Sequence, residues 1–480
     1  MPDVSVVGGG PNGLAAAVTM ARAGLSVELY ERSPTLGGGA RTMELTLPGF
    51  LHDVGSAVHP MGLASPFFRA FQLSRRIPFL VPEVSYVHPL AGTTAGVAYR
   101  DLDQTVDELG IDGGAWRHLM RPLVEHIDGV TDFTGSQLLR LPRDPVTALR
   151  FGLRTLEQGS PAWNLRFRGD TAPAMISGVS AHTIGRMPSL ASSGAGLVLA
   201  AHAHARGWAI PVGGSQSIID SMRQDLEAHG GVVHTSVEID DLRSLPESTA
   251  TLLDVSAASL KRIAGPALPD SYRSRLDRFR FGDGIAKVDF ALSAPVPWAN
   301  TEARRTGTLH LGGTRAELAR AEAAVARGEH ATAPYVLVSQ PTVLDPSRAP
   351  AGKHVLWAYI HVPRGSTLDP TAVVTDAVER YAPGFRDVIE ASSAMSAAEV
   401  ERYDPNFVGG DISSGALSIR QMLARPVVSA RPWRTPARGV YLASSSTPPA
   451  TGVHGLCGYY AARTALRDMF SLPVPSLRID

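Results

Sequence analysis

The chain has 480 residues, of which 44% are hydrophobic and 19% charged, a balance typical of globular proteins that excludes a disordered chain. Its 45 basic and 45 acidic residues cancel, so the net charge gives no argument for nucleic acid as a partner. The single cysteine, Cys457, excludes an intrachain disulfide and argues against a cysteine-ligated metal site.

The length exceeds one ordinary hydrophobic core and predicts two domains. The fold is expected to start at residue 4, which leaves no room for a signal peptide. The longest apolar stretch, residues 191–201, is interrupted by serine and glycine and is well short of the roughly 20 residues of a spanning helix. We therefore expect a cytoplasmic protein.

The first element carries a dinucleotide-binding fingerprint. A β-branched run at residues 4–7 precedes the pattern G-x-G-x-x-G, which opens an alanine-rich helix. In this motif Gly8 makes a tight turn, Gly10 lets the backbone approach a pyrophosphate, and Gly13 allows close packing of helix and strand. A pyrophosphate is then expected at the N-terminus of the helix.

The rest of a βαβ unit follows this motif. The sequence predicts a helix over residues 14–23, a stop at Gly24 and a second strand over residues 26–30. Glu31 ends that strand at the spacing expected for the acid that binds a ribose. The cofactor-binding residues expected from this unit are Gly8, Gly10, Pro11, Asn12, Gly13, Glu31 and Arg32.

A second glycine cluster, residues 37–41, comes next, and residues 50–56 follow it. Backbone without side chains can approach a second nucleotide moiety here, and Arg41 can pair with phosphate oxygens. A simple NAD domain does not need this segment, so its presence favours FAD. The further cofactor-binding residues expected here are Gly38, Gly39, Ala40, Arg41, Gly55 and Ser56.

Residues 61–86 interleave phenylalanine, leucine and isoleucine with arginine, which indicates an amphipathic segment. Such a segment packs between domains or in a homodimer, or it guards an apolar entrance or touches a membrane surface. Further along, His202 and His204 are two positions apart and do not share a helix face, so we expect no metal site there.

Later segments return to the nucleotide-binding domain. Residues 211–215 lead into a helix over 218–228, and strands over 232–235 and 237–239 follow. Near the C-terminus, a strand over 439–443 runs into a serine-rich turn. A helix over residues 459–469 ends the pattern.

We assign residues 1–75, 205–265 and 430–480 to a FAD-binding domain and residues 76–204 and 266–429 to a substrate-binding domain. The predicted fold class is α/β, with a Rossmann-like FAD-binding domain assembled from three segments. The substrate domain is expected to be α+β, with a mixed or antiparallel sheet. Its predicted elements are strands over 285–292, 335–339 and 354–361 and a helix over 314–327.

The chain resembles the FAD-dependent amine oxidase and carotenoid (phytoene) desaturase superfamily over nearly its whole length. It is most similar to the phytoene-dehydrogenase-related proteins, the branch with the pyridine nucleotide-disulfide oxidoreductase domain-containing proteins. The residues that carry the resemblance are Gly8–Gly13 with Glu31, Gly37–Arg41, Pro211–Gly214, Gly409–Asp411 and Tyr441–Gly458. Ser444 and residues 449–451 depart from the family's glycine and Pro-Gly-Gly.

The pattern T-P-P-x-x-G-V-H-G-x-x-G at residues 447–458 follows the desaturases in spacing. In that family it places a helix N-terminus under the flavin pyrimidine, where a helix dipole stabilises the charge of the reduced ring. The resemblance implies FAD as cofactor. The remaining expected cofactor contacts are Val237, Ser445, Gly452, Val453 and His454.

The resemblance also implies a reaction, the transfer of a hydride from a carbon of a largely apolar substrate to flavin N5. No second G-x-G-x-x-G follows a strand, so the electrons would leave to oxygen, a quinone or a diffusible carrier. Two alternatives remain. One is a redox-neutral flavin-dependent isomerase of a polyene or enone, and the other is a flavin-binding structural or interaction protein without turnover.

Three side chains are catalytic candidates. His454 is a candidate base, because its motif places it near the ring, although it would equally serve as a flavin contact or a helix cap. Lys287 shares one face of an alternating strand with Asp289 and either approaches N5 or lies on a solvated face. Tyr359 lines the substrate cavity or is a core tyrosine. Cys457 either packs in the last helix or carries the flavin covalently.

Overall fold

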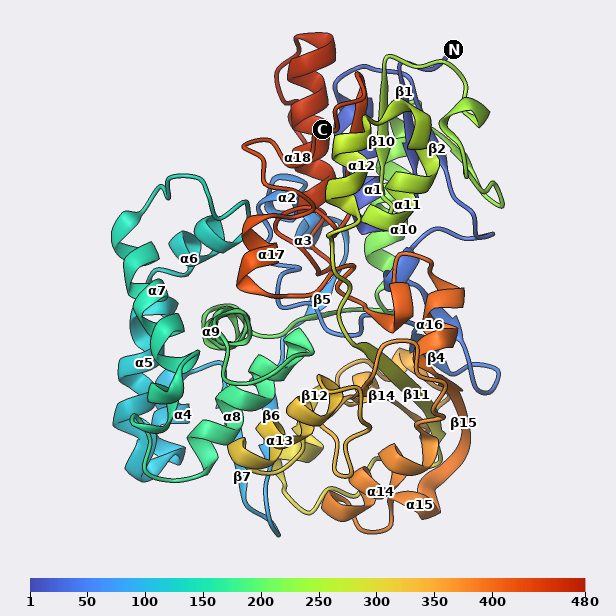
Figure 1. The fold of residues 1–480 in the computed structure, drawn as a ribbon. Coiled ribbons are helices and arrows are strands. Elements are labelled where there is room, and N and C mark those ends of the chain that lie inside the picture. Colours follow the sequence, from blue (N-terminus) through green and yellow to red (C-terminus); the bar gives the residue numbers. More distant parts are fainter. Residues whose placement is uncertain (480) are drawn as a thin grey trace.

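The computed structural model describes residues 1–479 and places one large sheet at each end of the molecule (Figure 1). The first sheet is parallel, with the strand order β16-β10-β1-β2-β9. Its strands are β1 (Val4–Val7), β2 (Val27–Tyr30), β9 (Val232–His234), β10 (Ala250–Leu253) and β16 (Val440–Leu442). Three separated parts of the chain therefore build one Rossmann-like sheet, as predicted.

Helices cover both faces of this sheet. Val4 and Val6 of β1 are buried in the cluster under α1 (Pro11–Arg22), α10 (Gln216–Ala228) and α18 (Leu456–Ala465). Val7 belongs to the cluster on the opposite face. That face is covered by α11 (Ala257–Ile263) and α12 (Asp270–Leu276). A strand that is buried on both faces explains why three of the four residues of β1 are valines.

The second sheet has seven strands in the order β15-β11-β14-β13-β12-β6-β7. They are β6 (Val84–Pro89), β7 (Ala95–Tyr99), β11 (Gly284–Leu292), β12 (Thr308–Leu311), β13 (Val336–Ser339), β14 (His354–Val362) and β15 (Ile389–Met395). Only the β12–β6 pair is parallel, so the sheet is mixed, as predicted. One face of this sheet packs on α14 (Thr371–Tyr381) and α15 (Phe385–Val388).

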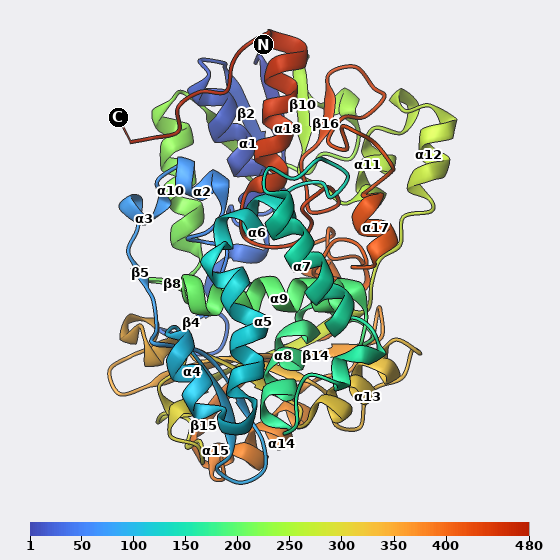
Figure 2. The same cartoon turned by 90° about the vertical axis from the view of Figure 1, so that its left-hand side faces the viewer.

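A helical layer stands beside the second sheet and faces the viewer in Figure 2. Its helices are α4 (Leu102–Glu108), α5 (Gly113–Glu125), α6 (Ile127–Thr134), α7 (Pro145–Gln158), α8 (Thr171–Ser180) and α9 (Leu190–Ala205). The longest, α9, runs through the middle of the layer, and its alanines pack against Trp116, Leu119 and Leu123 of α5. The main cavity of the molecule lies between this helical layer and the two sheets.

Short elements connect these parts. They are β3 (Thr42–Glu44), β4 (Leu51–Asp53), α2 (Pro66–Ala70), α3 (Leu73–Arg76), β5 (Phe79–Leu80), β8 (Ile210–Pro211), α13 (Arg315–Val325), α16 (Ala397–Tyr403) and α17 (Ile419–Leu423). The aromatic side chains of α2, Phe67 and Phe68, are 0% and 1% exposed and belong to the core under α1. Packing inside the protein is one of the alternatives that the sequence left open for residues 61–86, and these two side chains follow it.

The structure differs from the sequence prediction in three further places. Residues 237–239 form no strand, because Ser236 adopts a positive φ of 57° and the Val237 N–H donates to Glu31. The last helix starts at Leu456 and ends in a π-helical turn, Leu466–Phe470. Helix α12 packs on the first sheet, so the chain crosses to the second sheet after residue 280 rather than at 266. Within residues 1–479, no helix combines the length and apolar character needed to cross a bilayer.

Candidate functional site

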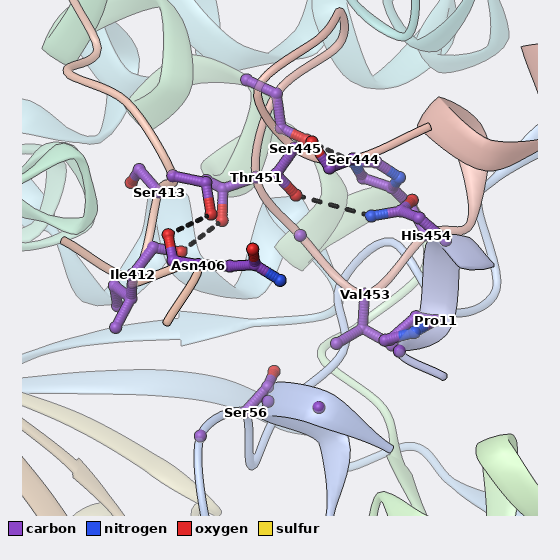
Figure 3. A pocket seen from close by; sticks show the side chains of 18 of the residues that line it. Pro11, Ser56, Asn406, Ile412, Ser413, Ser444, Ser445, Thr451, Val453 and His454 are labelled. Atoms are coloured by element: carbon purple, nitrogen blue, oxygen red, sulfur yellow. Dashed lines mark hydrogen bonds between the residues drawn. The ribbon is translucent and has the colours of Figure 1, made fainter. Parts of the chain in front are cut away.

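A single cavity of about 810 Å³ connects the glycine loop after β1 to the floor of the second sheet. Gly8, Gly10 and Glu31 line one end of it, and Trp357 and Tyr359 of β14 line the other. Part of its wall comes from the chain around Ser413, Ser445 and Thr451, which Figure 3 shows facing Pro11 and Ser56 across open space. Residues from all three segments of the first sheet meet here.

The glycine loop has the geometry that its spacing predicts. Gly8 adopts a φ of +100°, and a Cβ on Gly13 would lie 1.9 Å from the Gly8 carbonyl oxygen. At Gly10 the nearest atom to an added Cβ is Asp254 Oδ2, at 3.2 Å, so its backbone stays open to the cavity. Gly13 itself does not line the cavity, because its place is the contact between helix and strand.

The Glu31 carboxylate is held by the backbone around it. Its Oε2 accepts from Gly9 N–H at 2.8 Å and its Oε1 from Ser33 N–H at 2.7 Å, and Arg41 lies 3.4 Å away. Arg41 also donates to the Tyr403 hydroxyl at 3.0 Å. The end of the cavity next to the glycine loop is therefore mostly polar and closely packed. The residues that line it here are Glu31, Arg32, Arg41 and Val237.

The second glycine cluster brings two stretches of backbone together. A Cβ on Gly55 would lie 2.4 Å from the Gly39 carbonyl oxygen, to which Ser56 N–H donates at 2.9 Å. Gly38, Gly39, Gly55 and Ser56 line the cavity. Ala40 does not, because its side chain is fully buried in the core under α1.

The imidazole of His454 lines the cavity but has both nitrogens engaged by backbone. Nδ1 accepts from Leu456 N–H at 3.0 Å, and Nε2 lies 3.2 Å from the Ala450 carbonyl oxygen. Burial lowers the pKa of His454 to about 4. The ring therefore caps the start of α18, which is one of the alternatives open from the sequence, and it has no free nitrogen to take a proton. Ser445, Gly452 and Val453 line the cavity beside it.

Lys287 lies outside the cavity lining and is 1% exposed. Its Nζ donates to the Asp53 and Val54 carbonyl oxygens at 3.2 and 2.7 Å and pairs with Asp289 at 2.8 Å. The expectation of a solvated strand face is therefore wrong, and the ammonium has no donor left for a group in the cavity. Lys287 instead holds the loop that leads to Gly55.

Tyr359 lies on the cavity floor, which is formed by part of two rows of residues across the second sheet: Thr308, Leu337, Ser339, Trp357 and Tyr359 line the cavity. The strand register places His310, Leu337, Tyr359 and Lys287 in one row. Thr308, Ser339, Trp357 and Asp289 form the next row. Burial raises the pKa of Tyr359 well above its ordinary value, so its hydroxyl keeps its proton. The cavity wall beside the floor includes His182, whose Nε2 lies 2.9 Å from His310 Nε2.

The walls away from the floor are apolar. The side chains that form them come from α6, α7, α9 and the segments next to them, and they are Phe133, Leu138, Phe151, Leu156, Leu190, Val198, Leu199 and Trp208. Such a lining excludes charged ligands and suits a hydrophobic one. The sequence did not point to these residues, because a helix that packs on a core and a helix that lines a cavity have the same apolar pattern.

Asp254 is the main site residue missed in the sequence. It follows β10, is buried, accepts from Gly13 N–H at 2.8 Å and lines the cavity. Burial raises the pKa of its carboxyl group to about 8. Its position in the sequence could have identified it, because it directly follows a strand that runs parallel to β1, and parallel strands end at the same edge of the sheet. Asp404 and Asn406 line the cavity next to it.

Cys457 is fully buried in α18 and does not line the cavity. Its thiol lies 3.5 Å from the Thr447 and Ala450 carbonyl oxygens, and burial raises its pKa to about 12. These surroundings correspond to a packed helix residue rather than a covalent attachment point. His204 is also structural, since its ring bonds to Trp116 and to the Tyr99 carbonyl oxygen.

Comparison with known proteins shows what this chain is similar to. Residues 6–72 match the NAD(P)-binding Rossmann-like domain family. The chain is 24% identical to pyridine nucleotide-disulfide oxidoreductase domain-containing protein 2 of Rattus norvegicus, over 97% of this chain and 94% of that protein. The Mus musculus protein of the same name is 25% identical with the same coverage.

Solved structures share the whole fold at low identity. A triple mutant of putrescine oxidase superposes with a TM-score of 0.61 and 15% identity, covering 98% of this chain and 99% of that one. The chain therefore shares the overall fold of this oxidase. Cyclohexylamine oxidase from Brevibacterium oxydans gives a TM-score of 0.60 at 16% identity, with coverage of 98% and 99%. An oxidoreductase from Methanosarcina mazei gives 0.59 at 17%, with coverage of 95% and 98%.

The residues at the glycine loop fit a flavin or nucleotide cofactor. The Gly10 backbone is open to the cavity, where a Cβ would fill part of the space. The buried Asn12 Oδ1 has no hydrogen-bond partner within residues 1–479. The orphaned atom is a hydrogen-bond acceptor beside an open glycine loop, and a hydroxyl group of a bound ribose would satisfy it by donating to it.

Proposed function

We propose that the chain is a FAD-dependent oxidoreductase that takes a hydride from a carbon of a largely apolar substrate. The observation that carries the proposal is the continuous cavity, which joins a dinucleotide-type glycine loop to an apolar chamber. A nucleotide-binding protein without a substrate would need only the first half of that space. The superfamily fold and the amine oxidases among its structural neighbours support the same conclusion.

The residues that would hold FAD follow from the lining. Gly10 and the N-terminus of α1 would hold the pyrophosphate and Glu31 a ribose, while Ser56, Ser445 and Val453 lie where the ring end would be enclosed. When bound, FAD supplies the hydride acceptor for the reaction. The protein side chains then have to bind, orient and dehydrate the substrate.

The floor and wall supply the polar groups for that task. The Tyr359 hydroxyl faces the cavity and stays protonated, so it can donate a hydrogen bond to a substrate oxygen or nitrogen. His182 is neutral, because burial lowers its pKa to about 3, and its Nδ1, the ring nitrogen that is not paired with His310, can form a hydrogen bond with a substrate. With His454 engaged as a helix cap, we assign substrate orientation to Tyr359 and His182.

The electrons would leave to oxygen, a quinone or a diffusible carrier. The nucleotide-binding site formed by residues 8–13 is the only G-x-G-x-x-G in the sequence that follows a strand. A nicotinamide domain of the disulfide-reductase kind would need a second one. The substrate and the acceptor are therefore both small molecules that reach the same cavity.

The test is a visible spectrum of the purified protein, followed by an anaerobic screen of apolar substrates. We expect flavin absorption bands, and bleaching of those bands by a substrate under nitrogen. Product without net bleaching would instead support a redox-neutral isomerase. A flavin that no substrate reduces or converts would support a binding protein without turnover, and a chain that refuses FAD would overturn the proposal.

A further inference from the structure

Helix α7 exposes an apolar stripe that no part of the fold covers. Val146, Leu149, Leu153 and Leu156 are 57%, 63%, 57% and 56% exposed. Their spacing of three and four residues places them in one line along the helix. The neighbouring loops extend the stripe, since Leu141 and Leu165 are 92% and 84% exposed. Isolated exposed leucines are ordinary, but a continuous row of them marks a contact surface.

The opposite side of α7 already serves the fold. Thr147 and Phe151 are buried there, and Phe151, Gly152 and Thr155 line the cavity. An amphipathic helix needs only that one apolar side to pack on a core. The outward stripe is therefore not needed to pack the helix on the core of the described chain. Leu156 belongs to both sides, because it is exposed and also lines the cavity.

Helix α17 continues the same surface, and the cavity opens between the two helices where the exposed residues Leu156 and Ile419 both line it. Ile419 is 44% exposed and lines the cavity, and Val428, which follows the helix, is 71% exposed. The loop before α7 contacts this segment directly, because Gln137 Nε2 donates to the Ala430 carbonyl oxygen at 3.1 Å. We call this surface the apolar rim. Its members are Leu139, Leu141, Val146, Leu149, Leu153, Leu156, Leu165, Ile419, Leu423 and Val428.

The segments that carry the apolar rim are positively charged although the whole chain is neutral, since residues 136–166 hold five arginines against the two acids Asp144 and Glu157. No acidic residue stands between Asp411 and Asp468, whereas arginines recur through that segment. Arg150 on α7 and Arg420 on α17 are both exposed. Neither guanidinium has an acidic partner among residues 1–479. Unpaired cations beside exposed leucines are the combination that binds the surface of an anionic bilayer.

We propose that the apolar rim docks on an anionic phospholipid bilayer, with the mouth of the cavity against the lipid. A second copy of the chain is the other occupant to consider. In a twofold dimer the apolar rim of one chain would contact the same rim of the other chain. This would bring like-charged arginines together, which is unfavourable, whereas anionic headgroups would neutralise these arginines. The docking does not depend on the proposed reaction, but it would let an apolar substrate enter the chamber without crossing water.

Vesicle flotation of the flavin-loaded full chain tests the proposal. We expect it to float with vesicles of phosphatidylcholine and phosphatidylglycerol and much less with phosphatidylcholine alone. Leu149→Gln/Leu153→Gln should lower the vesicle partition coefficient at least about tenfold, because two exposed leucines that would insert into the lipid are lost. Val232→Gln is the matched control, since Val232 is 49% exposed on the distant strand β9 and should leave flotation unchanged.

A variant without the two arginines separates the electrostatic part of the membrane contact from the apolar part. Arg150→Gln/Arg420→Gln should weaken flotation with anionic vesicles severalfold, and added salt should weaken the wild type in the same direction. Unchanged thermal melting of all variants shows that folding is intact.

Two results would overturn the proposal. One is a wild-type chain that does not float with anionic vesicles. The other is a wild-type dimer by light scattering that the leucine variant makes monomeric while neither protein floats. Both readouts are independent of turnover, so a failure here is distinct from a failure of the proposed oxidoreductase activity.

Discussion

Asp254 shows how burial changes one carboxyl group at the cofactor end of the cavity. It accepts from Gly13 N–H and lines the space where a pyrophosphate would bind. Its pKa, raised to about 8 by burial, means that at neutral pH the folded chain keeps this carboxyl protonated. A neutral acid beside the glycine loop does not repel phosphate, which an ionised one would do.

The first prediction concerns the pH dependence of stability at this residue. The folded pKa lies above the value of about 3.9 for an exposed aspartate, so the folded state binds a proton that the unfolded chain releases. That stabilisation is complete below about pH 4 and is lost as the pH rises through about 8. Asp254→Asn keeps the acceptor and removes the ionisation.

We therefore expect the unfolding free energy of the wild type to fall relative to Asp254→Asn by about 1.4 kcal/mol per pH unit between about pH 5 and pH 7. Urea titrations at several pH values measure this difference. Asp240→Asn, at an exposed site, should run parallel to the wild type. If Asp254→Asn also runs parallel to the wild type, the carboxyl group is ionised in the folded chain.

At the scale of elements, the crossing of α1 and α18 sets the shape of the cofactor end. The helices touch at Gly458, where a Cβ would lie 1.7 Å from the Asn12 carbonyl oxygen. That carbonyl belongs to the first turn of α1, the turn expected to bind phosphate. Any side chain at residue 458 must therefore push this turn out of place.

We expect Gly458→Ala to destabilise the chain by about 1–3 kcal/mol and to weaken FAD binding, because overpacking moves the first turn of α1. Gly114→Ala is the matched control, since Gly114 lies in α5 with no atom within 4 Å of an added Cβ. It should stabilise the chain by about 0.5–1 kcal/mol. Chemical denaturation and flavin titration measure both effects, and equal behaviour of the two variants would contradict the prediction.

Elements with a strong local pattern could be predicted from the sequence. The alternating run that forms β11 and the strand that forms β14 differ from their predicted bounds by one residue at an end. The strand predicted at residues 237–239 failed because a positive φ at Ser236 turns the chain away from the sheet edge. The face on which α12 packs is a long-range contact, and no local pattern distinguishes one apolar surface from another.

The site divides in the same way. The glycine loops could be predicted because each glycine meets a steric requirement within a few residues of backbone. The roles of Lys287 and His454 could not, because they depend on which carbonyl oxygens and N–H groups distant segments bring to them. Tyr359 was found through its alternation along the strand, but its neighbour Trp357, on the same floor, was missed.

At the scale of the molecule, buried charges join the small β3–β4 sheet to the second large sheet. Arg348 and Asp53 are each 1% exposed at the side chain and lie 2.9 Å apart. Asp53 also accepts from Ser215 N–H, and Lys287 binds the carbonyl oxygen of the same residue. The loop that carries Gly55 toward the cofactor end is thereby tied to the substrate floor.

We expect Arg348→Met to cost about 3–5 kcal/mol of stability, because it leaves a buried carboxylate without its cation. The double variant with Asp53→Asn should cost less than the two single changes together, which a double-mutant cycle by urea denaturation measures. Arg121→Met removes an exposed arginine paired with Glu125 and should have no measurable effect. Strict additivity of the Arg348 and Asp53 changes would contradict the coupling.

The sealed position of Cys457 has a practical consequence. The chain has one sulfhydryl group, and it is hydrogen-bonded, deprived of its thiolate form and out of reach of solvent. A maleimide dye or spin label should therefore not react with the folded wild-type chain. Cysteines introduced in pairs on α7 and β9 can then be labelled without first removing the natural one, and distances between labels can be followed while the protein works.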